Sequence, residues 1–393
     1  VIDEPLFSIR GYDGRRPPRK DTLNPVTALA KAATGLQWNK AGWDLTTKEL
    51  KIRNGHFTDD RETERAAYSF FDGQHIDFQS IYGTFKNLQW DKDTIRTDLQ
   101  LSTKERSGIE VKSMTASLKW TPKEMDFRKL DLQTNNSRIR DHFRMSYDDF
   151  SDMDDFLHAI TLQGNFDNAD IDSDDIGYFA PELRTWKKKI SLSGYVSGPI
   201  DALTGKNIRA AAGNSTFLNG DISMTGLPDI NQTFIDFKAN DFRTTYADAV
   251  AIVPAMRSVT SPDLRSITYL TFKGSFTGFI RDFVTFGTIE TNLGTVTSDL
   301  NMKLPAKQEP VYSGTIATEN FNLGKFLGEK DLGQISMKGI VKGRGFKATE
   351  RNATVDGTIR YADYQQYRYH NITLKGKLDK KLFDGIASID DPN

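Results

Sequence analysis

Residues 334–345, QISMKGIVKGRG, carry the alternation that decides the fold of this chain. Apolar residues and glycines occupy one side of an extended strand, namely Ile335, Met337, Gly339, Val341 and Gly343. The residues between them are Ser336, Lys338, Ile340 and Lys342. A period of two predicts a β-strand with one apolar face and one solvent-exposed face. Glycines on the apolar face leave room for something to lie against the backbone.

The same alternation recurs along the chain. It is seen at 95–101, 114–120, 162–166, 190–198, 220–226, 272–278, 296–304, 355–361 and 372–378. Glycine, asparagine or aspartate stands at many of the breaks between these segments. Short two-faced strands with such turn residues predict an antiparallel meander.

Helical patterns are few and short. We predict helices at 24–35, where Asn24 suits the N-cap, at 147–160 and at 244–253, before Pro254. A turn or short helix is expected at 178–183, and residues 322–328 interrupt the strands. These helices are too short to cover the sheet. The sheet therefore either folds onto itself as a sandwich or barrel, or curls into a trough whose apolar lining meets a ligand.

Composition excludes several classes of protein. The chain has 393 residues, a net charge of −1 and no cysteine. A balanced charge argues against a nucleic-acid partner. We interpret the basic runs at 15–20 and 187–189 as solvated surface, with a contact to acidic lipid or a partner as the alternative. The absence of cysteine excludes thiol catalysis, cysteine-ligated metals and disulfides. No apolar run approaches the roughly 18 residues that span a bilayer.

Motifs for catalysis or cofactor binding are lacking in the sequence. The five histidines show no metal-ligand spacing. The acidic run 170–177 resembles the start of a calcium loop, but Asp175 replaces the required glycine and Pro181 the required glutamate. No phosphate-binding glycine loop occurs. The sequence therefore predicts no metal, no cofactor and no enzymatic activity.

Several short sequence motifs, in a particular order, resemble an interior segment of the TamB family, in its long form from Bacteroidetes. They are KERSG at 104–108, LDLQTNNS at 130–137, YDDFSDMDDF at 147–156, IGYFAPEL at 176–183, GSFTG at 274–278, NFNLG at 320–324 and DDPN at 390–393. Each motif alone is weak, and their order and spacing make the match. The resemblance covers nearly the whole chain.

The resemblance implies both a fold and a function. TamB proteins belong to the AsmA-like, bridge-like lipid-transfer superfamily and form the inner-membrane-anchored half of the translocation and assembly module. The implied fold is mainly β, an elongated, curled antiparallel sheet (a β-taco, or open β-groove) with a few short helices. The implied function is to carry glycerophospholipids through the periplasm of a Gram-negative bacterium, between its inner and outer membranes, with a linked role in outer-membrane protein assembly.

The same resemblance suggests partners and organisation. An outer-membrane barrel protein of the TamA/BamA type would bind through regions that we expect to lie outside this chain. The membrane anchor is also expected to lie outside it. We expect the chain to be an interior fragment, formed by β-groove segments at 1–145 with a short N-terminal helix, at 146–260 with helical insertions, and at 261–393. A single rounded core rarely exceeds about 300 residues, so we expect one continuous elongated unit.

Twelve residues are predicted to line the groove and bind lipid. They are Met224, Phe272, Phe276, Leu300, Met302, Ile335, Met337, Val341, Val355, Ile359, Ile372 and Leu374. The helices at 147–160 and 244–253 are expected to plug or cap the groove. For each lining residue, packing against an opposing wall is an equal alternative.

Two other functions fit the same pattern. The first is a chaperone-like periplasmic module that binds unfolded outer-membrane proteins by strand addition or in the groove. The second is a carbohydrate-binding or adhesive β-protein, with a sugar platform formed by Tyr361, Tyr364, Tyr367 and Tyr369.

Overall fold

The computed structural model describes residues 1–12, 38–39, 41–62, 66–179, 181, 184, 187–252, 256–257, 259, 262–305, 308–347 and 349–391. Strand accounts for 67% of the structure and helix for 9%. The strands form one curled, unclosed sheet of 21 strands, nearly all antiparallel. The predicted fold class is therefore confirmed. The predicted helix at 24–35 lies outside the described residues.

The chain divides into two compact units, residues 1–205 and 206–393. The boundary falls inside strand β11 (Ala202–Ala212). The division into segments at 1–145, 146–260 and 261–393 stays a prediction.

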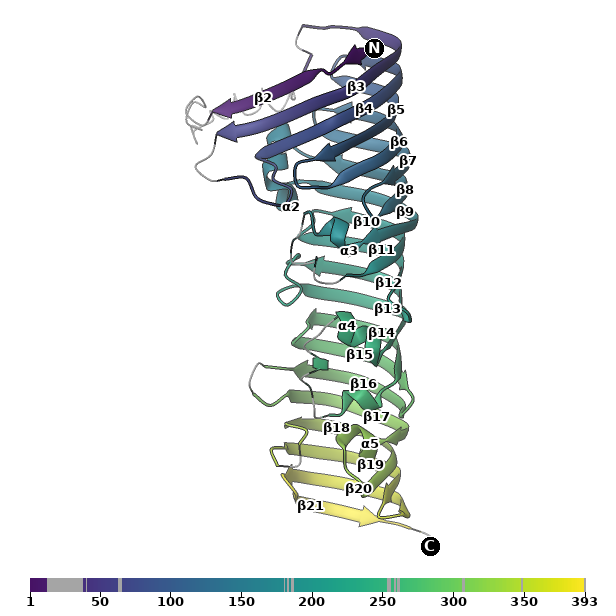
Figure 1. The fold of residues 1–393 in the computed structure, drawn as a ribbon. Coiled ribbons are helices and arrows are strands. Elements are labelled where there is room, and N and C mark those ends of the chain that lie inside the picture. Colours follow the sequence, from purple (N-terminus) through teal and green to yellow (C-terminus); the bar gives the residue numbers. More distant parts are fainter. Residues whose placement is uncertain are drawn as a thin grey trace, which may run out of the picture. The chain divides into compact units, whose positions relative to one another are not determined.

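The first unit is an antiparallel meander from β3 to β10 (Figure 1). Its strands are β1 (Ile2–Asp3), β2 (Leu6–Tyr12), β3 (Leu45–Glu62), β4 (His75–Asp91), β5 (Thr94–Glu105), β6 (Glu110–Thr121), β7 (Glu124–Gln133), β8 (Arg138–Ser146), β9 (Thr161–Asp172) and β10 (Lys189–Gly198). Strands β1 and β2 depart from the predicted meander, because both pair with β3 in parallel.

Short helices pack on the apolar face of this unit. The predicted helix at 147–160 begins later, as the 3-10 helix η2 (Phe150–Asp155) followed by α2 (Phe156–Ala159). The Asp152 carboxylate accepts hydrogen bonds from the backbone N–H groups of Asp148 and Asp149, which holds the preceding residues in a turn. Met153 is buried against Met125 and Met145 of the sheet. The helix α3 (Ser173–Ile176) follows β9.

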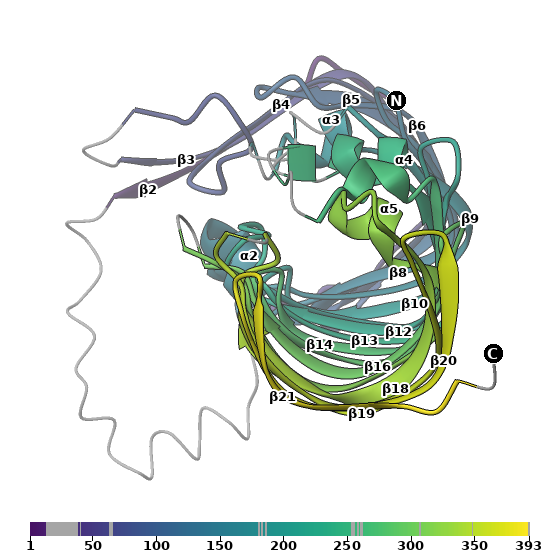
Figure 2. The same ribbon diagram turned by 90° about the horizontal axis from the view of Figure 1, so that it is seen from below.

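The second unit is itself a meander without a crossover, in which each strand from β12 pairs with the next. Its strands are β12 (Thr216–Thr225), β13 (Phe234–Thr245), β14 (Tyr269–Phe279), β15 (Asp282–Thr291), β16 (Gly294–Lys303), β17 (Val311–Asn322), β18 (Leu332–Arg344), β19 (Asn352–Tyr364), β20 (Tyr367–Asp379) and β21 (Leu382–Ile389). Its helices are α4 (Tyr246–Ile252), η5 (Leu264–Ser266) and α5 (Leu323–Leu327). Figure 2 shows these strands curling, with α4 and α5 on the inside of the curl.

Glycines let neighbouring strands of this unit approach closely. Gly274 of β14 pairs with Gly287 of β15, with φ of +150° and +151°. A Cβ on Gly274 would lie 2.1 Å from the carbonyl oxygen of Phe286, far inside van der Waals contact. The sequence predicts that such glycines leave room for something to lie against the backbone. Here the neighbouring strand occupies that room.

We predict that Gly274→Ala destabilises the second unit by about 2–4 kcal/mol, because the new methyl group clashes with a backbone carbonyl and strains a φ that L-residues rarely adopt. The matched control is Ser275→Ala, at the next position on the opposite face. Urea unfolding followed by circular dichroism measures both. Equal midpoints for the two variants would refute this account of the glycine pair.

Candidate functional site

Cross-strand register aligns apolar side chains on the inner face of the second unit. Cα partners in adjacent strands lie on the same face of a sheet, so a chain of partners marks a row across the strands. One row runs from β13 to β21 through Phe242, Phe272, Ile289, Val296, Thr318, Met337, Ile359, Ile372 and Ile389. The row is continuous from β13 to β21, although the register shifts next to it in the pairings β13–β14, β17–β18 and β18–β19.

Three more rows, each beginning on β12, run beside the first. The second contains Gly220, Ala239, Gly274, Gly287, Ser298, Ile316, Gly339, Gly357, Leu374 and Ala387. The third contains Ile222, Phe237, Phe276, Thr285, Leu300, Gly314, Val341, Val355, Gly376 and Gly385. The fourth contains Met224, Ile235, Gly278, Phe283, Met302, Tyr312, Gly343, Ala353, Leu378 and Phe383. We call these four the inner rows.

No residue of the inner rows carries a charge, in a chain that is 27% charged. Their few polar side chains are bonded within the protein. The Thr318 hydroxyl donates to the carbonyl oxygen of Ile335 at 3.1 Å, and the Thr285 and Ser298 hydroxyls lie 3.4 Å apart. The Tyr312 hydroxyl donates to the Gly345 carbonyl oxygen at 3.4 Å. The rows therefore form an apolar surface across ten strands.

The structure places all twelve predicted lining residues on this surface. Eleven belong to the inner rows, and Ile335 lies beside the first row, where β18 pairs with Phe321 and Ala362. Five of the twelve belong to clusters around buried residues: Phe272, Phe276, Ile335, Met337 and Ile359. The other seven are half-buried and lie outside these clusters: Met224, Leu300, Met302, Val341, Val355, Ile372 and Leu374.

The position of α5 identifies the surface as the inside of the curl. Leu323 and Phe326 of α5 pack in the same cluster as Ile335 and Met337. Figure 2 shows α5 within the curl of the strands. The side chains of Met337 and its row partners therefore face the interior.

The opposite face is polar and carries the charges. Lys375 of β20 forms a salt bridge with Asp356 of β19 at 3.1 Å, and Lys303 of β16 with Asp282 of β15 at 2.8 Å. Ile340, which alternates with Met337 and Val341 in β18, is 61% exposed on this face. The two sides of one strand thus meet different surroundings.

A β-bulge hid part of the site from sequence analysis. Phe237 and Phe242 of β13 are five residues apart, so strict alternation places them on opposite faces. The register shifts between Ala239 and Phe242, and both rings enter the same cluster as Phe272. An added residue in a strand reverses the parity of everything beyond it. Val296, which also lies on the inner rows, is in a strand whose pairing with β15 has no bulge, so simple alternation places it on the correct face.

Carboxylates fix the short helices to neighbouring turns. Asp248 of α4 is buried and accepts hydrogen bonds from the backbone N–H groups of Ser215 at 2.7 Å and Asn214 at 3.1 Å. Asp175 of α3 accepts likewise from Ser137 at 2.9 Å and Asn136 at 3.0 Å. In both cases the turn precedes the helix by two strands. The acidic run at 170–177 thus contains a structural anchor.

Hydrogen bonding outweighs burial at both anchors. Burial alone would raise the pKa of Asp248, but the N–H groups of Ser215 and Asn214, together with Thr216, hold the pKa below its ordinary value. The same balance lowers the pKa of Asp175, where burial opposes bonds from the 134–137 turn. A folded-state pKa below the unfolded value contributes stability above the unfolded pKa, and this contribution is lost as the pH falls through the folded pKa.

We predict that Asp248→Asn lowers the stability of the second unit by about 1–3 kcal/mol at neutral pH, because a neutral amide replaces a carboxylate that accepts several N–H groups. The difference from the unmodified chain should shrink as the pH falls from about 5 to about 2. Asp299→Asn, at an exposed position, is the control. Urea midpoints across this pH range provide the test, and a constant difference would exclude ionised Asp248 as the anchor.

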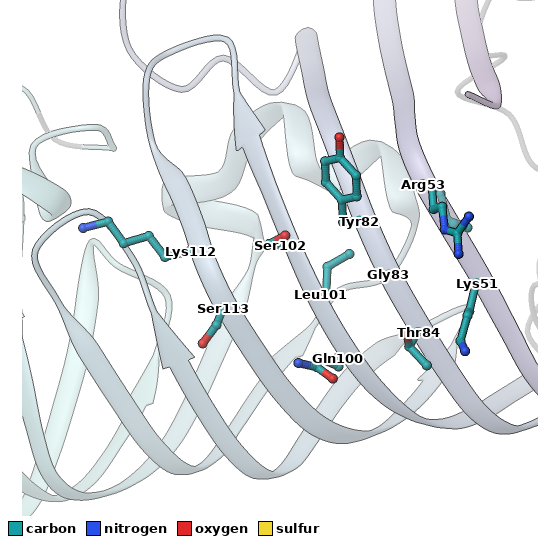
Figure 3. Close-up of a pocket in the computed structure, with 11 residues that line it drawn as sticks. Lys51, Arg53, Tyr82, Gly83, Thr84, Gln100, Leu101, Ser102, Lys112 and Ser113 are labelled. Atoms are coloured by element: carbon teal, nitrogen blue, oxygen red, sulfur yellow. The ribbon is translucent and has the colours of Figure 1, made fainter. Parts of the chain in front are cut away.

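A hollow of about 310 Å³ on the first unit has a different character (Figure 3). It lies over β3 to β6, and its lining includes Lys51, Arg53 and Lys112. Lys51 pairs with Glu49 at 3.0 Å, and the ammonium of Lys112 donates to the Asn135 carbonyl oxygen at 2.6 Å. Its polar, partly paired lining does not extend the apolar surface.

Within the described residues, no group of acidic residues and histidines is arranged to hold a metal ion. Nor does this part of the chain contain a helix long and apolar enough to cross a membrane. Comparisons with protein-family models, curated proteins and solved structures find no match.

Proposed function

We propose that the inner rows bind the acyl chains of glycerophospholipids, and that the chain is a segment of a conduit carrying these lipids between the inner and outer membranes. The observation that carries the proposal is the absence of charge from four register rows spanning β12 to β21. Their seven half-buried lining residues, from Met224 to Leu374, supply contact surface for a ligand.

Moving a lipid through water has a high free-energy cost, because its tails are exposed. A two-tailed lipid exposes about 30 methylenes at about 0.8 kcal/mol each, which makes extraction cost of order 20 kcal/mol. Such a barrier corresponds to events on a scale of minutes. An apolar face against which the tails lie removes most of that cost, and an unclosed sheet leaves the headgroup in water.

The dimensions of the surface suit an acyl chain. Ten strands spaced by about 4.8 Å extend about 43 Å in the hydrogen-bonding direction. A single tail occupies about half of a 30 Å hydrocarbon core, or about 15 Å. A tail can therefore move along the inner rows by more than its own length without meeting a charge.

The resemblance of the sequence to TamB proteins supplies the setting of the proposal. On the basis of this resemblance, we propose that the protein lies in the periplasm of a Gram-negative bacterium and is anchored in the inner membrane. Its partner would be an outer-membrane barrel protein of the TamA/BamA type, and a linked role in outer-membrane protein assembly is part of the proposal. We propose no catalytic activity.

The two other functions receive unequal support. An apolar face also suits the side chains of unfolded outer-membrane proteins, so a chaperone-like module stays the second candidate. The sugar platform fits less well, because Tyr361 is only 8% exposed and its hydroxyl donates to Asn320. The rings of Tyr367 and Tyr369 meet at 65°, not in one plane.

We predict that Met337→Arg lowers the phospholipid content of the purified chain by about thirtyfold, because a guanidinium on the inner rows must be desolvated when tails cover it. Solvent extraction followed by lipid mass spectrometry measures this content. Ile340→Arg is the matched control, since it adds the same charge three residues away on the outer face. Circular dichroism checks that both variants fold.

Two results would contradict the proposal. One is an unmodified chain that carries no phospholipid and takes up none from vesicles. The other is a folded Met337→Arg variant that keeps its lipid. Crosslinks from Val341 to client strands, without bound lipid, would instead support the chaperone-like module.

A further inference from the structure

A second hollow, of about 410 Å³, lies beside the inner rows in the second unit. Its walls come from three places: Ala249 and Ile252 of α4, Leu264 and Ile267 of the η5 segment, and Phe242 and Leu270 of the sheet. Among the described residues that line it, none carries a charge. It is therefore an apolar hollow with a helix on one side and strands on another.

The neighbouring helix shows why this space is empty. Helix α5 follows β17 as α4 follows β13, and the space beneath α5 is filled by a buried cluster of Leu293, Phe321 and Ile335. Leu293 stands in the turn before β16. The corresponding turn before β12 has Asn214 and Ser215, whose N–H groups bind Asp248. The polar turn fixes α4 but supplies no side chain to fill the hollow.

The wall formed by the η5 segment is also held in place by hydrogen bonds. The backbone N–H of Asp263 donates to the Phe326 carbonyl oxygen at 2.8 Å, which ties the η5 segment to α5. The Asn292 amide donates to the Ser266 carbonyl oxygen at 2.8 Å and accepts from the Thr268 N–H at 2.8 Å. A site whose walls are held before binding loses little conformational entropy when it is occupied.

We propose that this hollow binds the end of a single alkyl chain. The proposal rests on the proposed function in one respect, that the chain belongs to a lipid lying on the inner rows. Phe242 belongs both to the first inner row and to the wall of the hollow, so the two apolar surfaces are continuous.

Size and lining select the ligand. The volume is nearly three times the roughly 150 Å³ of an apolar cavity that holds one benzene, so the hollow accepts of order a dozen carbons. Two tails need more space than this. A charged headgroup would find no ionic partner among the lining residues that the structure describes. A lipid with one tail in the hollow keeps its other tail on the inner rows.

Fatty acids of 8 to 16 carbons, kept below their micelle concentrations, are the probes. We predict that affinity, measured by calorimetry on the delipidated chain, rises about fourfold per added methylene until the hollow is full. The methyl signals of labelled methionines locate the ligand, because Met256 lines the hollow, whereas Met302 and Met337 lie on the inner rows. Laurate should shift the Met256 signal.

Substitutions on α4 test the assignment. Ala249→Trp fills the hollow and should weaken laurate binding at least tenfold, whereas Ala247→Trp, at an exposed position on the same helix, should not. Ile252→Ala enlarges the hollow and should lengthen the best-bound chain by about three carbons. Laurate binding unchanged by Ala249→Trp, or an unshifted Met256 signal, would overturn the proposal.

The same spectra separate this proposal from the proposed function. Phospholipid taken up from phosphatidylethanolamine vesicles should shift the Met302 and Met337 signals. If those signals stay fixed while laurate still shifts Met256, the conduit fails and the alkyl site stands. If phospholipid shifts Met302 and Met337 but laurate leaves Met256 fixed, the alkyl site fails and the conduit stands.

Discussion

Register between adjacent strands is the constraint on which the second unit depends. Backbone hydrogen bonds fix which residues face one another, and a slip of one residue would turn a whole strand's apolar set outward. From β13 to β21 the partner of an inner residue is again an inner residue, as in the series Phe272, Ile289 and Val296. Eight successive pairings therefore act together to create a single apolar face.

That face is neither a filled core nor an exposed patch. At one side of it, buried side chains such as Phe321 and Ile335 pack beneath α5 in the ordinary way. Toward Leu300, Met302 and Val355 the side chains are half-buried instead. Soluble proteins rarely leave an extended apolar surface without a partner. The proposed lipid tails would supply that partner.

Two of the short helices, α3 and α4, are held in place by buried carboxylates. Asp248 and Asp175 hold their helices to turns through charged hydrogen bonds, which need few residues and little buried apolar area. A helix anchored in this way can keep its position although its apolar side chains do not fill the space between it and the sheet. The hollow lies beside α4, whose facing turn contains Ser215, and the packed cluster lies beside α5, whose facing turn contributes Leu293.

Alternation along single strands was enough to predict the mainly β fold and the shared face of Met337, Gly339 and Val341 in β18. These features depend on the pleat of one strand, which is local, and the sequence records it directly. Three other features depended on the tertiary structure. The bulge in β13, which brings Phe237 and Phe242 together, arises from pairing with β14; the direction of curl decides which face lies inside; and the hollow beneath α4 exists because segments distant in sequence fail to fill it. Each of these is a relation between strands or helices, and no single strand's pattern contains it.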